Sequence, residues 1–122
     1  MYKYSLLELK GIANILANDV TPPFSFFLHG EVGAGKTTFA QFFIKSILTE
    51  DCSVTSPTFN IVQIYETSKG PVFHADLYRL KKEEEIFEIG LIEAMRFNIC
   101  IIEWPKEIKK YIRDNNFLDI FL

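Results

Sequence analysis

The chain has 122 residues and a mass of 14.1 kDa, the size of one domain, and 48% of it is hydrophobic, which argues against disorder. The formal net charge of -3 provides no basic surface for gripping a nucleic-acid backbone unaided. The sequence contains two cysteines and no CxxC pair, which suits a reducing compartment better than a disulfide framework. The first residues lack an apolar signal segment, and no run approaches a membrane span. We therefore expect a cytoplasmic protein in which residues 1–122 form one domain.

The first part of the chain predicts a helix, a buried strand and a second helix. Ser5 and Glu8 form the S-x-x-E pattern of a capping box, and apolar residues recur at helical spacing from there to Asn18. The prolines after Thr21 end this helix because proline lacks an amide donor. Phe24–Leu28 is an almost wholly apolar run, typical of a parallel strand that is covered on both faces. A glycine-rich turn then leads into an amphipathic helix.

The rest of the chain predicts a hairpin, a helix and another buried strand. Residues 60–65 and 71–76 have the pattern of strands, and the turn between them indicates a hairpin, which would be an antiparallel insertion. A helix is expected over 81–95 with an interruption at Gly90, followed by a buried strand at 99–102. The tail from Lys106 predicts a charged connection or short helix that ends in an apolar segment. The expected fold is α/β, with a mainly parallel sheet and flanking helices.

The turn after the first strand has a complete phosphate-loop pattern, G-x-x-x-x-G-K-[ST], over Gly30–Thr37. Its glycines let backbone amides point at an anion, and the next helix adds the positive end of its dipole. Lys36 is expected to reach the β- and γ-phosphates, and Thr37 to ligate Mg²⁺. For Glu31 the alternative is that its side chain faces solvent or a partner. Thr38 either contacts the α-phosphate or only continues the helix. The residues predicted to bind a Mg-nucleotide are Glu31, Val32, Gly33, Ala34, Gly35, Lys36, Thr37 and Thr38.

Two carboxylates follow apolar strands, at the edge where ligands of open α/β sheets collect. Glu103 follows the apolar run at 99–102 and is the better placed to anchor Mg²⁺, directly or through water. Asp76 follows another strand and is expected to orient the attacking water or to act as a base. The alternative for either residue is that it only provides a solvated carboxylate at the end of its strand and has no role in binding or catalysis. His74 is interpreted as a structural histidine rather than a catalytic one.

Three further residues each have more than one interpretation. Thr58 lies in a polar turn and is equally a turn residue or a switch threonine that binds the γ-phosphate, which makes it a candidate catalytic residue with Asp76 and Lys36. Arg79 either stabilises transition-state charge or forms a structural ion pair. Trp104 belongs to the core, to a wall of the nucleotide site or to an interface.

The motifs GEVGAGKTTF, SPTFNIVQIY, HADLYRL and IIEWP, in this order and spacing, resemble the TsaE (YjeE) family. Members of this family are small bacterial ATPases required for making threonylcarbamoyladenosine in tRNA. The match runs from about Leu28 to Pro105. The first motif is shared by phosphate-loop proteins in general, whereas SPTF, H-x-D-x-Y-R and the Glu-Trp pair are quite specific to the family.

The resemblance implies ATP rather than GTP, Mg²⁺ on Thr37 and Glu103, an important Asp76 and a switch-like segment around Thr58. It also implies the partner proteins TsaD and TsaB, with tRNA contacted only through their complex. Relatives often carry threonine where this chain has Leu7, which implies a changed contact on the adenine side. They also usually continue beyond Leu122, which implies either a shortened wall of the nucleotide site or a truncated chain.

Other functions remain as alternatives on the sequence alone. A small-molecule kinase usually needs several arginines to clamp phosphates, whereas only Arg79 lies beside a motif here. A GTPase is disfavoured because the chain has no N-K-x-D string. A nucleotide-gated assembly subunit with little hydrolysis would carry the same motifs as an ATPase.

Overall fold

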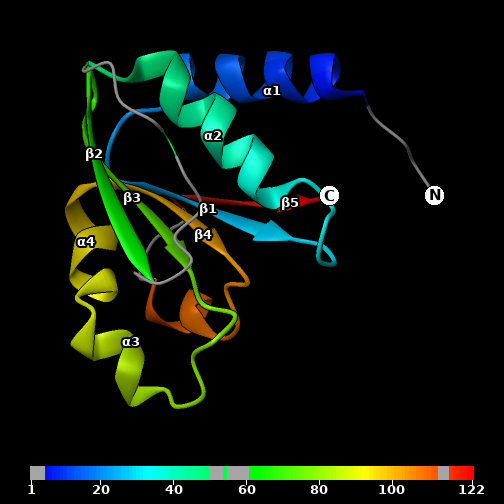
Figure 1. Ribbon diagram of the computed structural model, residues 1–122. Helices are drawn as coiled ribbons and strands as arrows, with labels where there is room; N and C mark the ends of the chain where they lie inside the picture. The colour runs from blue at the N-terminus through cyan, green and yellow to red at the C-terminus, as the bar shows by residue number, and fades with distance from the viewer. Residues whose placement is uncertain (1–4, 50–53, 55–60, 113–115) are drawn as a thin grey trace.

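The computed structural model describes residues 5–49, 54, 61–112 and 116–122 (Figure 1). One sheet with helices on both faces runs through these residues. The elements in chain order are α1 (Leu6–Asp19), β1 (Phe24–His29), α2 (Lys36–Ile47), β2 (Val62–Thr67), β3 (Gly70–Asp76), α3 (Glu84–Glu88), α4 (Leu91–Phe97), β4 (Ile99–Glu103), the 3-10 helix η1 (Ile108–Tyr111) and β5 (Phe117–Phe121).

The sheet has the strand order β2-β3-β4-β1-β5. β1 lies between β4 and β5 and is parallel to both, and β3 is parallel to β4. β2 is antiparallel to β3, with which it forms the predicted hairpin. The hairpin is part of the main sheet, since β3 is one of its parallel strands and β2 forms an edge. These findings confirm the α/β fold with a mainly parallel sheet.

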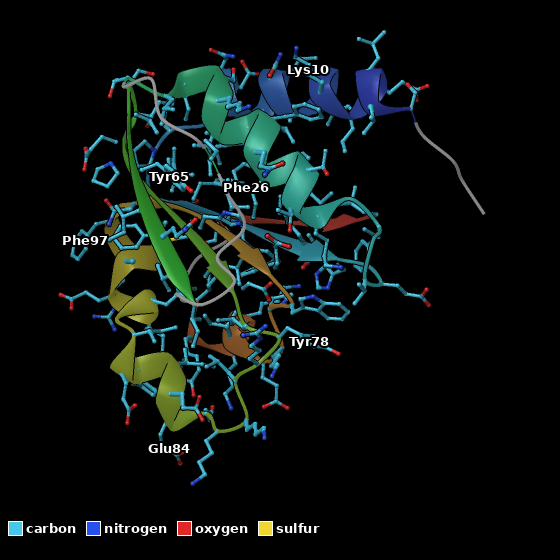
Figure 2. The ribbon with its side chains drawn as sticks, viewed as in Figure 1. Lys10, Phe26, Tyr65, Tyr78, Glu84 and Phe97 are labelled. Atoms are coloured by element: carbon cyan, nitrogen blue, oxygen red, sulfur yellow. The ribbon has the colours of Figure 1, made fainter. Side chains whose placement is uncertain are left out.

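The two faces of the sheet are covered by different helices. Figure 1 shows α1 and α2 together over one face and α3 with α4 on the opposite side. Phe26 of β1 and Tyr65 of β2 belong to the core between the sheet and the α1–α2 layer (Figure 2). Phe27 points to the opposite face, into the core formed with α3, α4 and η1. β4 is buried along its whole length, which explains its unbroken apolar run.

The start of α1 confirms the predicted cap. The Ser5 hydroxyl accepts a hydrogen bond of 3.1 Å from the backbone amide of Glu8. The helix ends at Asp19, one residue beyond the predicted end. No helix within the described ranges has the length and apolar character needed to cross a membrane.

The segment predicted as one interrupted helix over 81–95 forms two short helices instead. α3 ends at Glu88, and Gly90, the N-cap residue of α4, has a φ of 73°. A residue in this left-handed region cannot continue a right-handed helix, so the chain turns between α3 and α4. The apolar tail also has a definite place, because Phe117–Phe121 form β5 beside β1.

Candidate functional site

The glycine-rich loop, residues Gly30–Gly35, connects the carboxyl end of β1 to the start of α2. Its three glycines have φ values of 147°, 85° and 105°, which L side chains rarely adopt. A Cβ atom on Gly30 would in addition lie 2.9 Å from the carbonyl oxygen of Leu122. Gly35 is the N-cap residue of α2, so the loop leads directly into the free amides at the start of that helix.

Lys36 is the first residue of α2, and its side chain folds back over the loop. Only 5% of the residue is exposed. Its Nζ atom donates hydrogen bonds to the carbonyl oxygens of Gly30, at 2.6 Å, and Glu31, at 2.8 Å. The same atom lies 4.2 Å from the centroid of the Trp104 ring, a cation–π distance. The ammonium group is therefore held between the loop and the segment that follows β4.

Thr37, Glu103 and His74 form a hydrogen-bonded chain across the sheet edge. The Thr37 hydroxyl donates to Oε1 of Glu103 at 2.8 Å. The other carboxylate oxygen, Oε2, lies 2.6 Å from Nε2 of His74. Glu103 is 2% exposed and His74 is fully buried. This arrangement brings together the hydroxyl and the carboxylate that the sequence predicted as metal ligands.

Asp76 lies beside Glu103, because the parallel register of β3 and β4 pairs these two residues. Its Oδ1 atom accepts a hydrogen bond of 3.0 Å from the Tyr78 amide. Burial raises the pKa of the Asp76 carboxyl above its ordinary value, and the negative charge of Glu103 acts in the same direction. The Tyr78 amide opposes this effect by stabilising the ionised form.

The side chains of Lys36, Thr37, Asp76 and Glu103 line one cavity of about 400 Å³. Tyr78 lies on the segment after β3, at the end of the sheet where β1 leads into the loop (Figure 2). Its ring packs against Trp104, with ring centroids 4.9 Å apart. The lining consists of Val32, Gly33, Gly35, Lys36, Thr37, Thr38, Ile61, Asp76, Tyr78, Arg79, Glu103 and Trp104. The cavity thus joins a cationic, amide-rich wall to a wall that carries two carboxylates.

Most residues that the sequence predicted for the site meet at this cavity. Glu31 and Ala34 do not line it, although the Glu31 carbonyl holds Lys36 and the Ala34 amide donates to that same carbonyl at 3.0 Å. Thr58 lies outside the described residues. Arg79 lines the cavity and has no ion-pair partner among the residues that the structure describes, and both interpretations of this residue stay predictions.

Sequence reasoning missed two lining residues and two side-chain contacts, that of Lys36 with Trp104 and that of His74 with Glu103. Tyr78 belongs to the H-x-D-x-Y-R motif, which could have identified it, whereas Ile61 has no signal beyond its place before a strand. The contact of His74 with Glu103 joins residues 29 positions apart and depends on the pairing of β3 with β4. It leaves the buried Nδ1 atom of His74 without a hydrogen-bond partner in the described part of the chain.

The site offers only a few protein groups that could bind a metal ion. In the described ranges, no group of three or more His, Cys, Asp or Glu side chains is placed to hold a metal ion. The Thr37 hydroxyl and the Glu103 carboxylate offer hard oxygen ligands, the type that Mg²⁺ prefers. These two oxygens fit a Mg²⁺ ion whose other ligands come from phosphate groups and water.

Comparison with known proteins assigns the chain to a family. Residues 4–122 match the family model "Threonylcarbamoyl adenosine biosynthesis protein TsaE". A Rickettsia felis protein named tRNA threonylcarbamoyladenosine biosynthesis protein TsaE is 45% identical over 102 residues, which cover 84% of this chain and 60% of that protein. A Bacillus subtilis protein of the same name is 36% identical over 107 residues, with 86% and 65% covered. The match therefore spans about three-fifths of the length of these two relatives.

A solved structure agrees with this family. The crystal structure of Bacillus subtilis YdiB superposes with a TM-score of 0.64 and is 27% identical in sequence. The superposition covers 98% of this chain and 73% of that protein.

Proposed function

The chain belongs to the TsaE family, and we propose that it is a Mg-dependent ATP-binding and ATP-hydrolysing subunit. In this proposal it supports the biosynthesis of threonylcarbamoyladenosine in tRNA by a multiprotein complex. The relatives carry this biosynthetic role in their names. The proposal for ATP and Mg²⁺ rests on the geometry of the cavity.

The observation that carries the proposal is the position of Lys36. Its ammonium group lies at the start of α2, beside a loop whose glycines have the positive φ values that let backbone amides turn toward an anion. At present its donors are directed at two loop carbonyls, and these are weaker acceptors than an anionic phosphate. A triphosphate in the cavity would give Lys36 charged partners and would accept hydrogen bonds from the loop amides.

The acidic side of the cavity suits the metal and the attacking water. Thr37 and Glu103 would hold Mg²⁺, directly or through water. A bound Mg²⁺ ion would neutralise part of the negative charge of the phosphates. Asp76 lines the same cavity, and its raised pKa makes its carboxylate a better proton acceptor than an ordinary aspartate. In hydrolysis a water oxygen bonds to the γ-phosphorus, the bond to the β–γ bridging oxygen breaks, and Asp76 accepts a proton from the water. Thr58 stays a candidate for binding the γ-phosphate.

The partners in this proposal are TsaD and TsaB, as the family resemblance implies. The net charge of -3 argues that tRNA is contacted through the complex and not by this chain alone. A small-molecule kinase is less well supported, because kinases clamp phosphates with several arginines. Of the three arginines, Arg79 lines the cavity, Arg96 lines a different one, and Arg113 lies outside the described residues.

The test is phosphate release from Mg-ATP by this chain alone and then with TsaB and TsaD added. We expect slow release that increases with the partners and is lost in Lys36→Ala, which removes the cation facing the β- and γ-phosphates. If ATP stabilises the complex without any phosphate release, the chain is a nucleotide-gated assembly subunit. If partners change nothing and Lys36→Ala behaves as the wild type, the proposed function is wrong.

A further inference from the structure

We propose that His74 is a positioning residue for the metal site, where it fixes the orientation of the Glu103 carboxylate. The inference rests on the proposed function and extends it to a residue that does not line the cavity. His74 lies on β3, two residues before Asp76, and both side chains point to the face of the sheet that α2 covers.

The geometry of the carboxylate is the first argument. A carboxylate rotates readily about its terminal bond, so a single contact at Oε1 would leave its direction loosely defined. In this structure Oε1 accepts from Thr37 at 2.8 Å and Oε2 lies 2.6 Å from His74 Nε2. An ionised carboxylate only accepts hydrogen bonds, so Nε2 carries the proton in this pair. His74 thereby holds Oε2 and keeps Oε1 directed at Thr37.

The unpaired nitrogen of His74 is the second argument. A buried histidine that only filled the core would be expected to have both ring nitrogens satisfied. The Nδ1 atom has no partner in the described part of the chain, and its burial therefore costs free energy that an apolar residue would avoid. Among the described residues, the one hydrogen-bond partner of the His74 side chain is Glu103. The residue is therefore better suited to directing this carboxylate than to stabilising the core.

The consequence concerns the binding of the ion rather than of the nucleotide. A Mg²⁺ ion in the site would take the Thr37 hydroxyl oxygen as a ligand, and the hydrogen bond from Thr37 to Oε1 would then be lost. His74 is then the remaining contact among those described that fixes the carboxylate. Residues that orient metal ligands in this way typically affect metal affinity by tenfold or more when they are replaced. Loss of His74 should weaken metal binding and leave metal-free nucleotide binding nearly unchanged.

The experiment compares His74→Gln with His74→Asn. The amide nitrogen of glutamine reaches the position of Nε2, whereas the shorter asparagine reaches only that of Nδ1. Val72→Ala is the matched control, because Val72 is a buried residue on the same strand and face. For each protein, Mn²⁺ affinity is measured by electron paramagnetic resonance in the presence of ADP. ADP affinity without divalent ions is measured by calorimetry.

We expect His74→Asn to weaken Mn²⁺ binding about tenfold and to change metal-free ADP binding by less than about twofold. His74→Gln should recover Mn²⁺ affinity to within about threefold of the wild type, and Val72→Ala should match the wild type. The inference is wrong if the two histidine variants bind Mn²⁺ equally, or if metal-free ADP binding falls as much as Mn²⁺ binding. A wild-type chain that binds no ADP contradicts the proposed function, and the inference with it.

A measurement on the wild type covers the case in which the variants do not fold. Nitrogen-15 spectra of the His74 ring report which ring nitrogen carries the proton. The proton should remain on Nε2 in both the metal-free ADP complex and the Mg-ADP complex. Its transfer to Nδ1 when Mg²⁺ is added would overturn the inference, since Nε2 could then no longer donate to Glu103.

Discussion

Asp76 has a carboxyl group whose pKa is raised in the folded chain, so its ionisation there is less favourable than for an ordinary aspartate. Burial is the largest cause of its raised pKa, the Tyr78 amide opposes it, and the charge of Glu103 adds to it. A raised pKa in the folded state means that folding favours the protonated form. The contribution of this group to stability is therefore complete at low pH and is lost as the pH rises through the folded pKa.

Asp76→Asn should therefore make the nucleotide-free chain more stable at pH 7. Asparagine keeps an oxygen that accepts from the Tyr78 amide but has no charge to bury. The gain in melting temperature should shrink at low pH, where the aspartate is protonated in both states. ATP turnover should fall more than ATP affinity. Thermal unfolding between pH 4 and 8 checks this, and a variant that is less stable than the wild type at pH 7 would contradict it.

Trp104 allows nucleotide binding to be followed directly, because the chain contains a single tryptophan. The Lys36 ammonium lies 4.2 Å from its ring centroid, and a bound triphosphate should draw that ammonium away. We expect the tryptophan emission to change as Mg-ATP is added, and to stay constant in Lys36→Ala. Constant emission in the wild type, with ATP binding demonstrated by calorimetry, would show that Lys36 stays beside Trp104.

The break between α3 and α4 gives a test at the level of an element. Gly90 has a φ of 73°, whereas Gly11 lies within α1, and an added Cβ would meet no atom within 4 Å at either position. Gly90→Ala should therefore destabilise the chain by about 1 kcal/mol, from backbone strain alone. Gly11→Ala should stabilise it by about 0.5 to 1 kcal/mol. Urea unfolding measures both, and shifts in the same direction would contradict the assignment of the break to Gly90.

The elements differ in how far the sequence could predict them. β1 and β4 were predicted within one residue of their ends, because strands buried on both faces require unbroken apolar runs. The start of α1 was predicted because its cap is a local interaction between Ser5 and Glu8. β5 was expected only as an apolar segment, because its pairing with β1 depends on residues about 90 positions away. Such pairings leave no local signal.

The whole molecule assembles the cavity from four separate segments, namely the loop with the start of α2, Ile61, the residues from Asp76 to Arg79, and Glu103 with Trp104. The parallel sheet places the ends of β1, β3 and β4 at one edge, so the loop, Asp76 and Glu103 could be predicted to meet. The sequence could not predict that Glu103 would accept from Thr37 and also contact His74, since these contacts depend on side-chain directions across paired strands. The contact of Lys36 with Trp104 could not be predicted either. Trp104 has a φ of 52°, which is unusual for a residue other than glycine and has no local sequence signal.

The central claim is that this cavity binds a Mg-nucleotide through Lys36, and calorimetric titration of the chain with Mg-ATP tests it most directly. We predict one binding site for the wild type, and a loss of at least about tenfold in affinity for Lys36→Ala, because a charge that faces the phosphates is removed. Thermal unfolding of both proteins without nucleotide establishes that the variant is folded. Equal affinity of the two folded proteins for Mg-ATP, or no binding by the wild type, would contradict the claim.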